Sequence, residues 1–131
     1  MKRKKNDKRT SQTSTKRKIS EMIWEFAGDF IRLGRTQEQK EIRLIAASSA
    51  WNIACNPPEK QKALLDQYMA GFLRYNPSTD PANSAAIRND MEALVKRKLK
   101  MFPTDLRQIV SARLVPMGDK DRIEAVSATI G

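Results

Sequence analysis

The chain has 131 residues, 40% hydrophobic side chains and a formal net charge of +10, which is room for one domain of about 110 residues and a tail. It has one cysteine and no histidine, which excludes an internal disulfide framework, a Cys/His zinc site and the usual general base of enzymes. No stretch has the apolar core of a signal peptide or the length of a membrane span. We therefore expect no membrane partner and a cytoplasmic protein, or a nuclear one if the source is eukaryotic or a eukaryotic virus.

The positive charge is concentrated at the N-terminus. Residues 1–19 carry nine basic side chains and one acidic side chain, whereas the remainder of the chain has a net charge of only +2. The segment is too poor in apolar side chains to offset the entropy lost on ordering, so we predict a disordered basic arm over residues 1–19 and a single helical domain over residues 20–131. The basic residues of the arm are Lys2, Arg3, Lys4, Lys5, Lys8, Arg9, Lys16, Arg17 and Lys18.

A first helix is predicted from Ser20, as its N-cap, to about Leu33, with Gly34 as the stop. Trp24 and Ile31 form a small apolar stripe, which we expect to face another element or a partner. The main buried face follows the i, i+3, i+4, i+7 spacing of a helix and comprises Ile23, Phe26, Ala27, Phe30 and Leu33.

The predicted central helix covers residues 36–55, with Thr36 and Gln39 in the two positions of a capping box. Because it is apolar on most sides, we expect neighbours on most sides. Asn56 is expected to cap the next helix, with Pro57 at its first helical position. The two apolar stripes of the central helix are Ile42, Ile45, Ala46, Ser49 and Ile53, and Leu44, Ala47, Ser48, Trp51 and Cys55.

The third predicted helix runs to about Tyr75, and the fourth begins with Asp80 as its cap and ends before Pro103. The apolar face of the third is Leu65, Tyr68, Met69, Phe72 and Tyr75; that of the fourth is Ile87, Met91, Leu94, Val95 and Leu99. Four cations crowd the end of the fourth helix: Lys96, Arg97, Lys98 and Lys100. They offset the helix dipole, and they are also a possible secondary patch for phosphate.

The last part of the chain is rich in β-branched residues. Two such segments, residues 109–115 and 122–130, flank the turn-prone loop 116–121, which predicts a β-hairpin over about 108–130. A pair of short helices is the alternative, because the same apolar residues also fit helical spacing. The predicted fold is mainly α: a compact bundle of about four helices with a C-terminal β-hairpin, or all-α with two short C-terminal helices.

No catalytic, cofactor or metal site is expected. Cys55 lies near a helix C-terminus, which disfavours its thiolate, so we expect a buried and unreactive thiol. The carboxylate pairs Glu38/Glu41 and Asp119/Asp121 lack the ligand series of a calcium loop. The four large polar-edged aromatics are expected in the core or at its edge: Trp24, Trp51, Tyr68 and Tyr75.

The basic arm is the segment whose charge indicates a function most clearly. Flexible basic arms bind phosphate backbones by releasing counterions, without reading sequence. We therefore predict a non-enzymatic accessory protein that associates with DNA or RNA through the arm. The alternative is a protein–protein adaptor or a homodimer that uses the hairpin or the Trp24/Ile31 stripe, with the arm serving for targeting or solubility.

Overall fold

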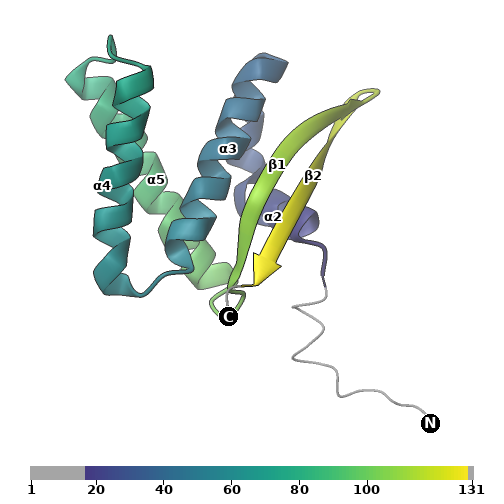
Figure 1. Ribbon diagram of the computed structural model, residues 1–131. Coiled ribbons are helices and arrows are strands. Elements are labelled where there is room, and N and C mark those ends of the chain that lie inside the picture. Colours follow the sequence, from purple (N-terminus) through teal and green to yellow (C-terminus); the bar gives the residue numbers. More distant parts are fainter. Residues whose placement is uncertain (1–16, 130–131) are drawn as a thin grey trace.

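A computed structural model describes residues 17–129. Four helices precede an antiparallel two-stranded hairpin (Figure 1), so the predicted bundle with a C-terminal hairpin is confirmed and the alternative with two short C-terminal helices is wrong. The elements are α2 (Ile19–Arg32), α3 (Gln37–Ala54), α4 (Pro58–Tyr75), α5 (Pro81–Met101), β1 (Arg107–Met117) and β2 (Lys120–Thr129). No helix within the described residues is long and apolar enough to cross a membrane.

Helix α2 begins earlier than its sequence predicts. Lys18 is the N-cap and Ser20 lies inside the first turn, so the proposed Ser20 cap is wrong. The reason is burial: Ile19 is only 6% exposed and joins Met22 and Ile23 in the core. Residues 17–19 therefore belong to the folded domain and not to the arm, while the predicted disorder of residues 1–16 lies outside the described residues.

Helix α3 is the central element, in contact with α2, α4, α5 and β1. Thr36 caps it through Oγ1, which accepts a hydrogen bond from the backbone of Gln39 at 3.1 Å, as predicted. Leu44 and Trp51 are fully buried, and the Trp51 ring meets Phe26 edge-on with 5.7 Å between the ring centres.

The apolar stripe of α3 that contains Ile42 and Ile45 is not buried along its whole length. The prediction of neighbours on most sides is confirmed by the contacts with α2, α4, α5 and β1, but Ile42 and Ile45 are 55% and 53% exposed. Figure 1 shows the reason: α3 and α4 lie close together near their connection and diverge toward the start of α3. Within residues 17–129 no helix covers the first half of this face.

The link between α3 and α4 caps the end of α3 but provides no side-chain cap for the start of α4. Pro57 is the N-cap of α4 and Pro58 its first residue, so the prediction that Asn56 caps α4 is wrong. Instead, Asn56 Nδ2 donates to the backbone oxygen of Asn52 at 2.9 Å, which satisfies one of the last carbonyls of α3. At the next corner Asp80 caps α5 by accepting from Asn83 N at 2.8 Å, as predicted.

The hairpin turn is tighter than predicted. Pro116 pairs with Asp121 and Met117 with Lys120, which leaves only Gly118 and Asp119 in the loop expected over residues 116–121. Gly118 has φ +66°, and two-residue loops need such positive φ values to match the twist of the strands. The inward face of the hairpin adds Ile109, Leu114 and Ile123 to the core, over α2 and α3.

Candidate functional site

The root of the basic arm is fixed to the domain. Arg17 makes an ion pair with Glu25, and its backbone oxygen accepts a hydrogen bond from Arg107 Nη1 at 2.9 Å. Lys18 is the N-cap of α2. The other predicted nucleic-acid-binding residues, Lys2 to Lys16, lie outside the described residues.

The last turns of α5 lie beside this root. Arg97 Nε donates to the backbone oxygen of Phe26 at 2.7 Å, and Arg97 Nη2 donates to that of Glu25 at 3.3 Å. Glu25 therefore contacts Arg17 through its carboxylate and Arg97 through its backbone. The fold brings together two basic segments that are about 80 residues apart in sequence. Lys96 and Lys100 are exposed on the same turns.

Lys98 does not belong to that surface. Its side chain is 0% exposed; its Nζ donates to the backbone oxygen of Asp105 at 2.5 Å and lies 4.9 Å from the ring centre of Trp51. Loss of hydration lowers the pKa of Lys98, an effect that nearby Cys55 and Asp105 oppose. A phosphate cannot reach this ammonium, so the predicted four-residue patch is reduced to three.

The sequence does contain a signal for this burial. Lys98 stands four residues after Leu94 and seven after Met91, which is the spacing of the buried stripe of α5. Sequence reasoning assigned it to the helix end because three other cations lie within four residues. The position of Lys98 in the buried stripe, and not the charge of its neighbours, determines that its side chain points into the core.

Asp105 and Arg107 complete a buried polar junction around Lys98. Arg107 Nη2 and Nε lie 2.6 Å and 3.0 Å from the two carboxylate oxygens of Asp105. Burial raises the pKa of Asp105, but the hydrogen bonds and charge of Arg107 outweigh it and hold this pKa below its ordinary value. The Trp51 indole Nε1 donates to the Arg107 backbone oxygen at 2.7 Å. These groups satisfy one another, so the polar junction is suited to joining α3, α5 and β1.

Cys55 lies at the edge of the polar junction. It is half-buried at the C-cap of α3, and its Sγ lies 3.6 Å from the backbone oxygen of Arg107. Burial raises the pKa of the Cys55 thiol, although Lys98 partly offsets this effect. The thiol form therefore prevails at neutral pH, and Cys55 is suited to weak hydrogen bonding.

Each carboxylate pair singled out from the sequence has one member engaged with a protein group. Glu41 accepts a hydrogen bond from the backbone of Leu114 at 2.7 Å, and Asp121 pairs with Lys40 at 3.2 Å. Across residues 17–129 no three potential metal ligands of the His, Cys, Asp or Glu type are grouped.

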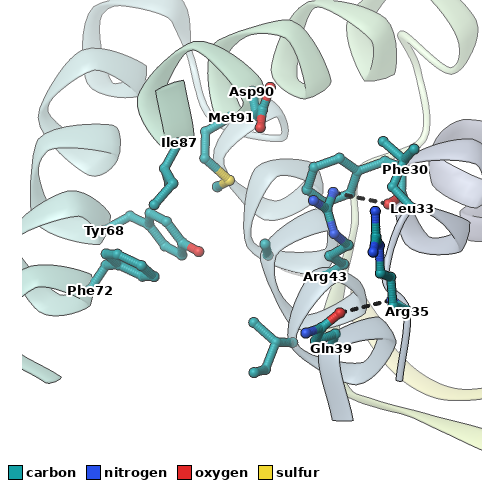
Figure 2. Close-up of a pocket in the computed structure, with 12 residues that line it drawn as sticks. Phe30, Leu33, Arg35, Gln39, Arg43, Tyr68, Phe72, Ile87, Asp90 and Met91 are labelled. Atoms are coloured by element: carbon teal, nitrogen blue, oxygen red, sulfur yellow. Dashed lines mark hydrogen bonds between the residues drawn. The ribbon is translucent and has the colours of Figure 1, made fainter. Parts of the chain in front are cut away.

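An apolar groove lies between α3 and α4 (Figure 2), with a volume of about 480 Å³. We call it the α3–α4 groove. Its apolar lining is Phe30, Leu33, Ile42, Ala46, Tyr68, Phe72, Ile87 and Met91, and its polar lining is Arg35, Gln39, Arg43 and Asp90. A second depression of about 450 Å³ shares Ile42, Tyr68 and Phe72 and extends the surface to Ile45 and Tyr75.

The aromatic residues divide between core and surface. Trp51 is buried and Tyr68 is half-buried, as expected, but Tyr75 is 84% exposed and its predicted place at the core is wrong. The Trp24/Ile31 stripe is not an open face either. Ile31 is fully buried, and the Arg32 guanidinium lies 5.1 Å from the ring centre of the half-buried Trp24.

Comparisons with models of protein families, with characterised proteins and with solved structures found no match to this chain. Function is therefore inferred from its own charge and geometry.

Proposed function

We propose that this chain is a non-enzymatic protein that binds the phosphate backbone of DNA or structured RNA through its N-terminal arm. Lys96, Arg97 and Lys100 extend the binding surface onto the domain. The observation that carries the proposal is the double contact of Glu25, which holds Arg17 at the root of the arm beside Arg97 of α5. Lys96 and Lys100 are exposed on the same turns of α5, with Lys96 on the side that faces α4.

The charge is sufficient for binding by counterion release. Residues 1–16 carry seven basic side chains and one acidic side chain. Each phosphate neutralised on duplex DNA contributes about −0.9 to the slope of log affinity against log salt concentration. The arm has no aromatic residue for stacking on bases, which favours contacts to the backbone over reading of sequence. We place this activity in the cytoplasm, or in the nucleus where the source is eukaryotic.

The test is a titration of the full chain against a fluorescent 20-base-pair duplex and an RNA hairpin, from about 50 to 300 mM salt. The expected slope is steeply negative, and deletion of residues 1–16 should remove most of it. The double variant K96Q/K100Q should make the slope shallower by up to about 2, because two phosphate contacts are lost.

The matched control is R74Q/K120Q, which removes two exposed cations that lie in the last turn of α4 and beside the turn of the hairpin. It should leave the slope within about 0.5 of the parent chain. Equal effects of the two double variants would show that net charge alone drives binding, and a slope near zero for the parent chain would refute the proposal.

A further inference from the structure

The α3–α4 groove exposes an unusual set of large apolar side chains. Leu33 is 68% exposed, Ile42 55%, Ile45 53% and Tyr75 84%. All four line the groove or its extension, next to the half-buried rings of Phe30, Tyr68 and Phe72. Contiguous apolar surface of this kind on a folded domain marks a place where another molecule binds.

The walls have the shape of two unpaired helix faces. Along α4, Tyr68, Phe72 and Tyr75 follow the i, i+4, i+7 spacing of one ridge. The facing residues run from Arg35, just before α3, to Ala46, and the helical part of this stretch covers about 14 Å, or two and a half turns, at 1.5 Å per residue. Because α3 and α4 diverge, these ridges do not interlock with each other (Figure 1). A helix of another molecule that binds between α3 and α4 would pack against both ridges.

Two of the three charged side chains that line the groove are cations, Arg35 and Arg43, and the third is Asp90 of α5. Arg35 and Arg43 lie on the wall opposite Tyr68 and Phe72 (Figure 2), and among residues 17–129 neither guanidinium has a carboxylate partner. Arg43 instead donates to the backbone oxygen of Phe30 at 3.1 Å and covers the Phe30 ring. A ligand with carboxylates beside an apolar face complements this wall.

The chain's own arm cannot be the occupant. Residues 1–16 contain one apolar side chain, that of Met1, and their cations would meet Arg35 and Arg43. We propose that the α3–α4 groove binds an amphipathic helix of a partner protein, three to four turns long, with its apolar face between α3 and α4 and its carboxylates at Arg35 and Arg43. This site is separate from the proposed nucleic-acid surface and stands without it. The Trp24/Ile31 stripe offers no comparable surface, because Ile31 is fully buried.

The test uses a synthetic 16-residue helical peptide with leucines at i, i+3, i+4 and i+7 spacing and glutamates along one flank. A sibling peptide carries lysines in place of the glutamates. Each is titrated into the isotopically labelled full chain at constant salt, and binding is followed by amide chemical shifts. The glutamate peptide should perturb Leu33, Ile42 and Phe72 and bind at least tenfold more tightly than the lysine peptide.

Two sets of variants locate the site. I42S/I45S and, separately, R35E alter exposed groove residues and should each weaken binding of the glutamate peptide by tenfold or more. V110S/V126S alters two hairpin residues of similar exposure, 65% and 58%, and should leave binding unchanged. The proposal is overturned if the glutamate peptide does not bind at 1 mM, if the shifts fall on the hairpin, or if both peptides bind equally. It is also overturned if sedimentation equilibrium shows that the parent chain is a dimer and that I42S/I45S is a monomer.

Discussion

The side-chain amide of Asn52 pairs with the backbone of Ile109 as a neighbouring β-strand would. Its Nδ2 donates to the Ile109 oxygen at 2.9 Å, and the Ile109 N–H donates to Oδ1 at 2.7 Å. One helical residue thereby satisfies both exposed polar groups of an edge position of β1. Open strand edges otherwise leave such groups to solvent or to other chains.

A second contact repeats this arrangement along the same edge. Glu41 accepts a hydrogen bond from the Leu114 N–H at 2.7 Å. Asn52 stands 11 positions after Glu41, which is about 16 Å of helix, and Leu114 stands five positions after Ile109, which is about 16 Å of strand. Because the two lengths match, α3 lies antiparallel along β1 and engages it at two points. A two-stranded hairpin is marginal by itself, and these contacts attach it to the bundle.

Replacing Asn52 should therefore destabilise the domain. Asn52→Ala leaves the N–H and C=O of Ile109 unpaired next to a helix, so we expect the free energy of unfolding to fall by about 2 kcal/mol. Urea denaturation measures the change, and Asn89→Ala, an exposed α5 residue, is the control. A loss below about 0.5 kcal/mol would show that water replaces the amide without cost.

Two glycines should respond to alanine in opposite directions. A Cβ on Gly34 would lie 2.7 Å from the backbone nitrogen of Lys40, so Gly34→Ala must move the start of α3 and should cost about 1–3 kcal/mol. A Cβ on Gly71 meets nothing within 4 Å, and Gly71→Ala in the middle of α4 should stabilise by about 0.5–1 kcal/mol. Thermal unfolding of the two variants measures the sign of each stability change. Changes of the same sign in both variants contradict the prediction.

Lys98 should tolerate loss of its charge better than loss of its volume. Lys98→Met fills the same space without a desolvated ammonium, so we expect stability within about 1 kcal/mol of the parent. Lys98→Ala leaves a cavity beside Trp51 and should cost about 2–4 kcal/mol. If both variants lose the same free energy of unfolding, the hydrogen bond to Asp105 outweighs the cost of burying the charge.

The pKa of Lys98 predicts how this comparison changes in alkali. Because the pKa of Lys98 in the folded chain lies below its ordinary value of 10.5, the unfolded chain binds more protons between the two pKa values. The parent should therefore gain stability relative to Lys98→Met as the pH rises through that window toward 10.5. Urea midpoints of both proteins at intervals from pH 7 to pH 10.5 measure the difference; a flat or falling difference contradicts the expectation.

Asp105 should give a pH dependence of the same sign, but in acid. Its folded pKa lies below its ordinary value of 3.8, so the carboxylate stabilises the fold above that value, and this stabilisation is lost as the pH falls through the folded pKa. Asp105→Asn should be less stable than the parent at neutral pH, and the gap should narrow below pH 3.8. Denaturation curves at pH 7, 4 and 2.5 provide the measurement. A constant gap would mean that the Arg107 contact does not depend on the charge of Asp105.

Local features of this chain were predictable where neighbours in sequence decide the outcome. Thr36 and Asp80 cap their helices as expected because an N-cap bonds to a backbone group only three residues away. The β-branched character of the last residues likewise predicted the hairpin. The arm's charge is also a property of sequence alone, whereas the position of Arg17 beside Arg97 depends on the contacts of Glu25.

The sequence by itself determined the helices, their order and two of their four N-caps, since helical spacing and capping act within one or two turns. Only the tertiary structure decided which apolar stripe is covered. Leu44 and Ile45 are adjacent on α3, yet the first is fully buried and the second is half exposed because α4 diverges from α3 beside it. The burial of Lys98 and the open α3–α4 groove have the same physical origin: helix directions arise from the packing of the whole domain and not from the residues of one helix.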